Sequence, residues 1–265
     1  MDRLLEATAR AERHHFWFRG FRAFVTPLVE RAVDGRPAEI LDCGAGTGHN
    51  LQWLARFGRA TGIDLTWSGL AYARAAGRTR LARASAAALP FSRASFDLVT
   101  SFDVLQCIPD EAEEMAVREM RRVLRPGGHL VVTVAALNLL RGNHSVLSRE
   151  VRRYGRKDLR RLLEAAGFDL LAVTYTHATL FPIIAPLRAL QRLSGLAASD
   201  ADAAAAQEIS IPPAPINALL GGLLSLEARV VRTVPMPFGS SLAALARPKR
   251  EPIRRNGAIR GRPGR

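Results

Sequence analysis

A glycine-rich segment and an acidic residue that follows it by about one helix and one strand are the residues best placed to do chemistry. An apolar run over 40–43 leads into Gly44, Gly46 and Gly48, and a second apolar run ends at Asp64. Glycine accepts the φ values of a tight turn and lets backbone N–H groups approach a ligand closely. An acidic side chain at the end of the next strand can accept hydrogen bonds from two ribose hydroxyls. The two segments predict a site for an adenosine-bearing cofactor.

The spacing of the glycines distinguishes between cofactor classes. Nicotinamide and flavin sites carry G-x-G-x-x-G, whose third glycine lets the helix pack closely on the strand while its N-terminus meets a pyrophosphate. Here His49 stands at that third position, and the glycines read G-x-G-x-G. With segments 40–50 and 62–65 together, the chain resembles the class I S-adenosylmethionine-dependent methyltransferases. A glycine triplet alone is weak evidence, so a nicotinamide or nucleotide-sugar enzyme stays an alternative.

Three further segments resemble the same family in the expected order. Segment 84–91 reads A-S-A-A-A-L-P-F, similar to a family segment G-D-A-E-A-L-P-F whose second residue lies by the adenine amino group. Segment 96–105 is similar to the fourth strand and the loop after it, which faces cofactor and acceptor. Segment 123–132 resembles the L-x-P-G-G turn that enters the fifth strand. The resemblance covers nearly the whole chain and implies S-adenosylmethionine as the cofactor.

The cofactor site that this resemblance implies is formed by residues at the ends of the first four strands. Asp42 anchors the glycine loop or reaches the methionine amine, and Ser101 or Asp103 touches the amino-acid end of the cofactor. Ser85 lacks the charge of the family's carboxylate, so its contact with adenine should be weaker. His49 lines the cofactor turn. The implied cofactor-binding set is Asp42, Gly44, Ala45, Gly46, Gly48, Asp64, Leu65, Ser85, Ala86, Ser101 and Asp103.

The N-terminal segment predicts a lid. Residues 2–35 are expected to form two helices broken near 14–20, and this break resembles the H-W-W-F-x-x-R-R element of some bacterial methyltransferases. The residues that match are His15, Phe16, Trp17, Phe18 and Arg19. We expect them to contact cofactor or acceptor; ordinary core packing is the alternative meaning of such aromatic residues.

Histidines are the candidates for a general base. A hydroxyl acceptor would benefit from a base near its proton, and histidine is the usual choice near neutral pH. His15 in the lid is the first candidate, followed by His144 and His177. Each of the three can instead be a packed or surface histidine.

The apolar runs predict an α/β fold. They lie at 38–43, 60–65, 80–84, 97–102, 128–135 and 168–176 and alternate with helix-period segments, one of them over 150–167. Nearly continuous apolar strands indicate a parallel sheet covered by helices on both faces. The resemblance adds a seventh strand at 240–246, antiparallel beside the sixth, which gives the Rossmann-like, mostly parallel sheet of these methyltransferases.

We expect one α/β domain with an insertion. A helical lid over 1–35 precedes a cofactor-binding core over 36–175, and the insert over 176–239 is longer than a hairpin connection requires. The insert is the expected acceptor cap. After the last strand at 240–246 comes a basic tail over 247–265, which is expected to be disordered.

The charge of the chain is concentrated at its C-terminal end. The net charge is +14 over 265 residues, and segment 247–265 carries eight basic residues and one acidic residue. We expect a solvated tail or a weak contact with a membrane surface or polyanion. No N-P-P-Y-like loop follows the fourth predicted strand, which disfavours a nucleic-acid base methylase, and no sequence-specific nucleic-acid partner is expected.

Two cysteines outside any disulfide framework, with no leader, predict a reduced, cytoplasmic protein. No apolar run reaches about 18 residues, so no membrane-spanning helix is expected. Cys/His clusters at metal-ligand spacing are missing from the sequence, so no metal is expected. These observations predict methyl transfer to a hydroxyl or related group on a small glycan, lipid or secondary-metabolite intermediate. A catalytically silent protein that retains the cofactor fold is the second alternative.

Overall fold

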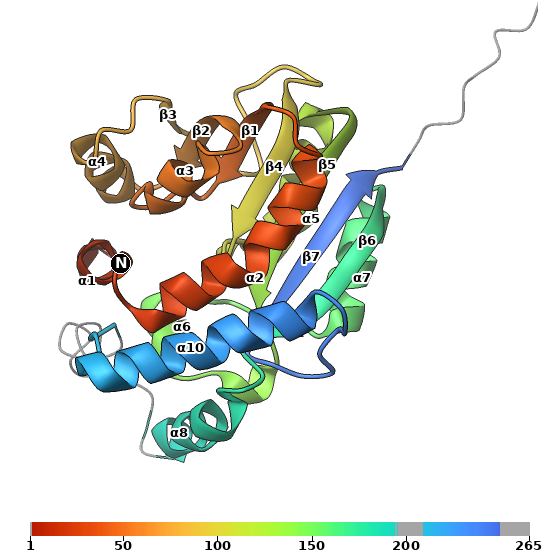
Figure 1. Cartoon of the computed structure of the whole chain (residues 1–265). Helices are drawn as coiled ribbons and strands as arrows, with labels where there is room; N and C mark the ends of the chain where they lie inside the picture. Colours follow the sequence, from red (N-terminus) through yellow and green to blue (C-terminus); the bar gives the residue numbers. More distant parts are fainter. Residues whose placement is uncertain (1, 194, 196–208, 250–265) are drawn as a thin grey trace, which may run out of the picture.

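The computed structural model describes residues 2–193, 195 and 209–249 (Figure 1). The predicted tail from residue 250 onward and the linker around 199–207 lie outside these residues. The helices are α1 (Asp2–Ala11), α2 (Phe16–Val33), α3 (His49–Leu54), α4 (Trp67–Ala75), α5 (Asp110–Val123), α6 (Asn143–Leu147), α7 (Arg156–Ala165), α8 (Phe181–Leu193) and α10 (Ala214–Val231), with 3-10 turns η1 (Leu105–Cys107) and η2 (Asn138–Leu140). The strands are β1 (Ala38–Cys43), β2 (Gly58–Asp64), β3 (Leu81–Arg83), β4 (Phe96–Phe102), β5 (Leu124–Ala135), β6 (Phe168–Thr176) and β7 (Ser241–Pro248).

The seven strands form one sheet in the order β3-β2-β1-β4-β5-β7-β6. Strands β1 to β5 pair in parallel, whereas β7 lies between β5 and β6 and is antiparallel to both. This confirms the predicted seven-stranded α/β sheet with an antiparallel last strand. The parallel strands therefore end at a common edge, where the candidate site residues of β1, β2 and β4 meet.

Alternate residues of the central strands face opposite layers of helices. Ile40 and Leu98 belong to a buried cluster with α2 and α3, whereas Leu41 and Val99 belong to a cluster with α5 and α7. This follows from the two-residue period of a strand. Because both faces are covered, the central strands are nearly continuously apolar, as the sequence predicted, and their polar residues include Asp42 of β1 and Ser101 of β4.

Helix α2 is part of the sheet's covering layer. Its residues Phe21, Val25, Val29 and Ala32 are buried against the strands in the same cluster. The segment predicted as a lid, 1–35, therefore includes a core helix. Helix α2 joins this cluster from Phe21 onward, whereas Phe16 and Trp17 in its first turn pack on the cluster shared with α10.

The insert between β6 and β7 contributes α8 and α10. Helix α10 lies along α2 (Figure 1), and the close approach needs Gly20, because a Cβ there would lie 2.4 Å from Cδ1 of Leu224. Among the described residues, α10 is the helix whose length and composition would suit a membrane span, although no such helix was expected. In this structure α10 packs against α2 along one side.

Four predicted boundaries were wrong. The break expected near 14–20 lies at 12–15, because His15 caps α2 and the helix begins at Phe16. Strand β7 runs to Pro248, two residues into the segment expected as the tail, because it stays paired with β6 to that point. The helix expected over 150–167 begins at Arg156, because the preceding Tyr154 forms a backbone bridge with Ala136 and Asp158 caps the helix through the N–H of Gly155 at 3.0 Å. The turn expected before the fifth strand is instead an irregular start of β5, with Gly127 at φ +84° and a register shift against β4.

Candidate cofactor and acceptor site

The glycine loop between β1 and α3 has three glycines in the left-handed region. Gly44, Gly46 and Gly48 have φ values of +86°, +49° and +74°. A Cβ on Gly44 would lie 2.2 Å from Cγ2 of Val104, and one on Gly48 would lie 2.7 Å from the Cβ of Ala73. The outer glycines are thus required by packing as well as by φ. A Cβ on Gly46 would meet only Leu5 of α1, at 3.9 Å, so this part of the loop has room on its open side.

Asp64 ties the second strand to the glycine loop. Its Oδ2 accepts a hydrogen bond from the N–H of Gly46 at 2.8 Å. Its Oδ1 accepts bonds from the N–H of Thr66 at 2.8 Å and from the Thr66 hydroxyl at 2.6 Å. The carboxylate is half-buried and has about four acceptor sites, so it retains capacity for a ribose hydroxyl.

Asp42 is a buried carboxyl with one unpartnered oxygen. The side chain is 1% exposed; Oδ1 accepts a hydrogen bond from the Thr100 hydroxyl at 2.7 Å, and Oδ2 has no partner among the described residues. Burial, with a smaller contribution from the nearby charge of Asp64, raises the pKa of Asp42 to about 7. A buried oxygen without a donor suits a cationic amine, and this fits the amino-acid end of S-adenosylmethionine.

The end of β4 carries two polar residues in different environments. Ser101 is fully buried, and its hydroxyl has no partner within the described part of the chain. Asp103 is exposed with φ +57°, and its Oδ1 accepts a hydrogen bond from the Thr133 hydroxyl at 3.2 Å. Ser101 is the penultimate residue of β4 and Asp103 follows the strand directly, and their contact with the cofactor stays a prediction.

The predicted adenine side lies after β2 and β3. Ser85 and Ala86 are half-buried in a tight turn, where the Ser85 hydroxyl accepts a hydrogen bond from the N–H of Ala87 at 3.2 Å. Leu65 is exposed, and its carbonyl accepts a bond from Arg83 Nε at 3.0 Å. The serine oxygen thus already serves its own turn, which agrees with a weaker side-chain contact to adenine than a carboxylate would make.

Helix α1 reaches the glycine loop through a contact that the sequence did not predict. Both carboxylate oxygens of Glu12, just after α1, lie within hydrogen-bond distance of the Thr47 hydroxyl, at 2.8 and 2.7 Å. Arg22 of α2 donates to the Glu12 backbone carbonyl at 3.1 Å. Burial raises the pKa of Glu12. The N-terminal segment therefore holds the glycine loop through the contact between Glu12 and Thr47.

His49, at the position that excluded the dinucleotide motif, begins α3. Burial, together with the charges of Arg22, Arg13 and Arg78, lowers its pKa to about 4. The imidazole is thus neutral near pH 7. This suits a side chain that lines the cofactor turn, as predicted, more than one that carries charge.

His15, the first candidate for the base, caps helix α2. Its Nδ1 accepts a hydrogen bond from the N–H of Trp17 at 3.1 Å, so its other nitrogen carries the proton and bonds to the Ser210 backbone. The ring stacks on Phe16 and meets Phe18 edge-on. Both nitrogens are engaged, so a role as base would require the cap to open.

Trp17 packs into a buried cluster with His177. The two rings stack at 4.1 Å between centroids, and Phe24 lies on the histidine at 4.9 Å. Burial lowers the pKa of His177 to about 3, and its Nε2 has no partner within the described part of the chain. The neutral histidine joins the start of α2 to the end of β6. Arg19, the last of the matching lid residues, is exposed.

Asn217 of α10 clamps the segment that precedes α2. Its Oδ1 accepts a hydrogen bond from the N–H of Phe16 at 2.8 Å, and its Nδ2 donates to the carbonyl of His14 at 2.9 Å. The predicted lid and the predicted cap are therefore in direct contact, although they lie at opposite ends of the chain.

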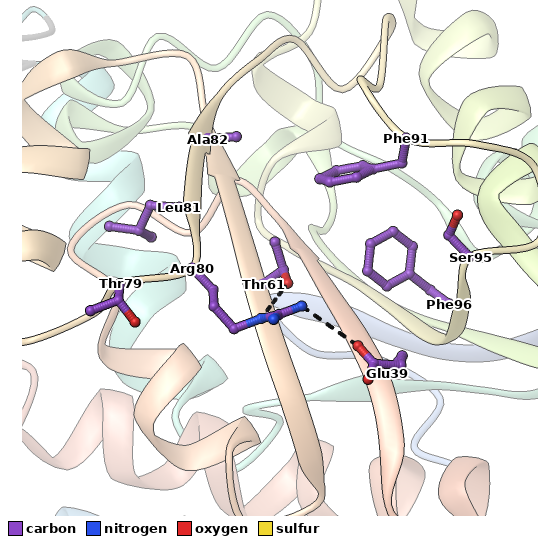
Figure 2. Close-up of a pocket in the computed structure, with 9 residues that line it drawn as sticks. All are labelled: Glu39, Thr61, Thr79, Arg80, Leu81, Ala82, Phe91, Ser95 and Phe96. Carbon is purple, nitrogen blue, oxygen red and sulfur yellow. Dashed lines mark hydrogen bonds and ion pairs between the residues drawn. The ribbon is translucent and has the colours of Figure 1, made fainter.

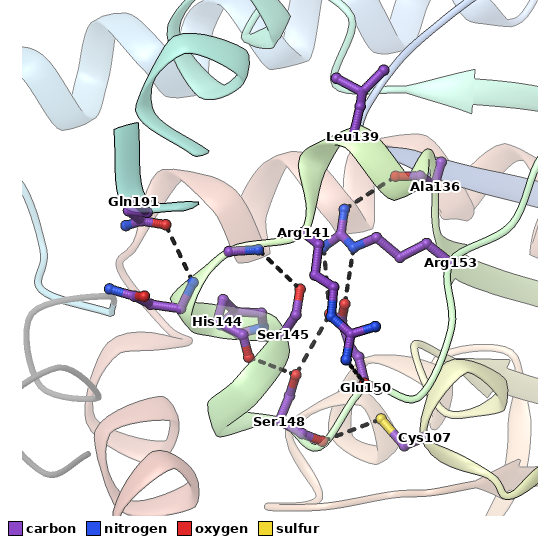
Figure 3. A network of polar contacts seen from close by, with 12 residues as sticks. Cys107, Ala136, Leu139, Arg141, His144, Ser145, Ser148, Glu150, Arg153 and Gln191 are labelled. Carbon is purple, nitrogen blue, oxygen red and sulfur yellow. Dashed lines mark hydrogen bonds and ion pairs between the residues drawn. The ribbon is translucent and has the colours of Figure 1, made fainter. Parts of the chain in front are cut away.

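The loop after β5, which carries His144, is held by a buried ion pair. Arg153 Nε lies 2.9 Å from Glu150 Oε2; the Glu150 side chain is buried and the Arg153 side chain is 10% exposed. Arg153 also donates to the carbonyl of Ala136 at 3.0 Å, and Arg141 donates to the carbonyl of Glu150 at 3.1 Å (Figure 3). This network fixes the loop on the carboxyl edge of the sheet.

A separate hollow of about 420 Å³ lies beside β3 and the starts of β1 and β4, away from the glycine loop (Figure 2). Among the residues that line it, Arg80 donates from Nε to the Thr61 hydroxyl at 3.1 Å, and its terminal nitrogen lies 3.6 Å from Oε2 of Glu39. These polar groups already satisfy one another. No predicted site residue lines this hollow, and we assign it no ligand.

Metal ligands do not gather in the described part of the chain. Within residues 2–193, 195 and 209–249, no three His, Cys, Asp or Glu side chains come together at a metal-binding distance. Cys43 and Cys107 are both free. That the protein uses no metal stays a prediction.

The chain is similar in sequence to known methyltransferases. A methyltransferase domain model matches residues 41–132. The chain is 32% identical to a probable S-adenosylmethionine-dependent methyltransferase of Mycolicibacterium smegmatis, over 59% of this chain and 60% of that protein. It is 35% identical to a demethylmenaquinone methyltransferase of Roseiflexus castenholzii, over 67% and 74%. It is 31% identical to a malonyl-[acyl-carrier protein] O-methyltransferase of Erwinia pyrifoliae, over 65% and 66%.

Solved structures share the fold. A putative methyltransferase of Bacillus halodurans C-125 aligns with a TM-score of 0.56 at 21% identity, over 85% of this chain and 99% of that one. The [4+2]-cyclase SpnF aligns with a TM-score of 0.55 at 22% identity, over 86% and 82%. The glycine loop, the acidic end of β2 and these relatives agree: the chain belongs to the class I S-adenosylmethionine-dependent methyltransferases.

Proposed function

We propose that the protein transfers a methyl group from S-adenosylmethionine to an oxygen or related group of a small glycan, lipid or secondary-metabolite intermediate. The observation that carries the proposal is the conjunction of the glycine loop, the carboxylate of Asp64 and the unpartnered Oδ2 of Asp42 at one edge of the sheet. Asp64 would hold the ribose and Asp42 the amine. The bound cofactor supplies an electrophilic methyl group on a sulfonium.

Alignment of the acceptor is the main task left to the protein. Methyl transfer from a sulfonium is an in-line displacement, so the protein must orient the acceptor and exclude water. Two contacts support a cover over the acceptor made of lid and cap. Asn217 binds the segment before α2, and Trp17 stacks on His177. The apolar and aromatic character of this cover favours an acceptor with an apolar body.

The acceptor's identity does not transfer from the relatives. The names of the Roseiflexus and Erwinia relatives specify a quinone precursor and an acyl-carrier substrate, which differ in chemistry. An O-methyl product is named for the second of these and supports an oxygen acceptor.

The experiment that tests the function is comparative metabolomics of a deletion strain. Restoring the wild-type gene should restore a product heavier by one methyl group than the compound that accumulates, and labelled methionine should carry its label into that product. The Asp64→Ala gene should restore it poorly. A profile identical in all three strains would count against methyl transfer as the activity.

His15 as general base stays a proposal with a direct test. Asparagine is a good helix N-cap, so His15→Asn keeps an acceptor for the N–H of Trp17 while removing the base, whereas His15→Ala removes both. A base role predicts a large fall in kcat for both variants and loss of an acidic limb in the pH profile. Full kcat in His15→Asn would limit the residue to its cap.

A second candidate function follows from SpnF, which has this fold and is a cyclase. In this second function the chain would keep its cofactor site and bind S-adenosylmethionine without transferring the methyl group. Stoichiometric binding of labelled S-adenosylmethionine with no labelled product from a broad extract would favour that function.

A further inference from the structure

Helix α10 presents a continuous apolar stripe to solvent. The stripe follows the spacing of three and four residues that places side chains on one face of a helix. Leu219 is 64% exposed and Leu226 is 58% exposed, whereas Leu224 on the other side is buried against α2. The exposed members are Ile216, Leu219, Leu223, Leu226 and Val230.

Helix α8 carries a second stripe of the same kind. No residue of α8 is buried. Its Ile184 packs on the cluster shared by α2 and α10, and Arg188 and Gln191 approach Gly142, so the remaining side points away from the rest of the fold. The exposed members on that side are Ile183, Leu187, Leu190 and Leu193. We call the two stripes together the insert face; α8 lies next to α10 in Figure 1.

The charges beside the insert face are all positive among its described residues. Arg229 and Arg232 are exposed near the C-terminal end of α10. Arg188 and Arg192 of α8 are turned toward the fold instead: Arg188 approaches Gly142, and Arg192 donates to the carbonyl of Arg141 at 3.1 Å. The single acidic residue of this described part, Glu227, is 3% exposed and accepts hydrogen bonds from the N–H groups of Ala178 and Thr179. The other acidic residues of the insert lie outside the described residues, at Asp200, Asp202 and Glu208.

The combination of an apolar stripe with flanking arginines selects one kind of partner. A second copy of this chain would match the apolar side chains, but pairing would bring Arg229 and Arg232 of both copies together with no exposed carboxylate on the described face to offset them. An anionic lipid surface accepts apolar side chains between its head groups and attracts the arginines. We propose that the insert face docks on the surface of an anionic lipid bilayer.

Helix α10 lies along the bilayer surface rather than across it. On the inner side of α10, Leu224 packs on Gly20 of α2. The buried Glu227 accepts a hydrogen bond from the N–H of Ala178, in the segment that leads into α8. A spanning orientation would remove both contacts and place a carboxylate in hydrocarbon. This inference is independent of the methyl acceptor, because the contact is made by the outer side of the insert.

The test is vesicle co-sedimentation of the full-length protein. We expect binding to vesicles of equal parts phosphatidylglycerol and phosphatidylcholine, no binding to phosphatidylcholine alone, and weakening by salt. The double variant Leu219→Asp, Leu226→Asp should bind at least tenfold more weakly. Met115→Asp, at a comparably exposed position on α5, is the matched control and should bind like the wild type. Circular dichroism and melting confirm that each variant is folded.

Two further experiments distinguish membrane binding through the insert face from binding through the basic tail and from self-association of the protein. Changing the arginines at 254, 255, 260, 262 and 265 to glutamine tests the basic tail. If this change abolishes binding while the double insert variant binds normally, the proposal is overturned in favour of the tail. If light scattering shows a dimer that the double insert variant converts to a monomer, and neither protein binds vesicles, the insert face is an interface between copies. Absence of binding by the wild type also refutes the proposal.

Discussion

Replacing Asp64 by alanine tests the ribose assignment at its strongest contact. The carboxylate accepts three hydrogen bonds in the absence of ligand, one from Gly46 and two from Thr66. The variant therefore loses two kinds of interaction: the internal bonds that position the glycine loop, and the bonds to the ribose hydroxyls. The experiment must separate these two losses.

The expected magnitude follows from the charge of the acceptor. Hydrogen bonds to a charged group contribute about 1.5 to 3 kcal/mol each, and Asp64 is half-buried, so water recovers part of this. We expect cofactor affinity to fall by about 1 to 3 kcal/mol, or roughly 5- to 150-fold in Kd. Thr66→Val is the matched control, because it removes one donor to the same carboxylate and leaves the carboxylate in place.

The assay is calorimetric titration with S-adenosylhomocysteine and with its 2′-deoxy analogue. The wild type and Thr66→Val should both bind the analogue more weakly than the parent compound. Asp64→Ala should bind the two almost equally, because the partner of the missing hydroxyl has already been removed. If the analogue loses the same affinity in Asp64→Ala as in the wild type, Asp64 does not hold the ribose.

Four other outcomes are expected. Burial raises the pKa of Asp42 to about 7, so the folded protein binds this proton more tightly than the unfolded chain, and stability falls as pH rises from about 4 to 7; Asp42→Asn should reduce that slope in urea denaturation. Arg153→Ala leaves the buried Glu150 unpaired and should cost about 3 to 5 kcal/mol of unfolding free energy, with much of it recovered by adding Glu150→Gln; a loss under about 1 kcal/mol would contradict a buried pair. Asn217→Ala removes two hydrogen bonds to the segment before α2, so hydrogen exchange there should accelerate roughly 5- to 30-fold, or about 1 to 2 kcal/mol, and unchanged exchange would contradict the clamp. Burial raises the pKa of the Cys107 thiol to about 12, so it should react slowly with Ellman's reagent at pH 8 until the protein is unfolded; rapid native reaction would contradict this.

Much of the fold was predictable because it depends on local patterns. Apolar runs of strand length placed the first six strands within a few residues, and the glycines at 44, 46 and 48 placed the loop, since their φ values need residues without a Cβ. The start of α7 was placed too early, because the helical period of the sequence continues through residues that instead pair with the end of β5. The spacing of apolar residues alone does not reveal such a backbone bridge.

The contacts that complete the site were not predictable, because they join residues far apart in the chain. Nothing near Glu12 indicates that its carboxylate meets Thr47, and nothing near Asn217 indicates that its amide clamps Phe16. The resemblance placed His15 in the lid without revealing that its Nδ1 caps a helix. Histidine is not among the residue types that usually cap a helix, so its position before α2 gave no cap signal.

The central claim is that the carboxyl ends of β1 and β2 hold the cofactor, and a crystal structure with S-adenosylhomocysteine tests it most directly. We predict the ribose hydroxyls on Asp64, the ammonium beside Asp42 and the adenine beside Ser85 and Ala86. A ligand bound in the hollow beside Arg80, or no ligand between these strand ends at a saturating concentration, would contradict the account.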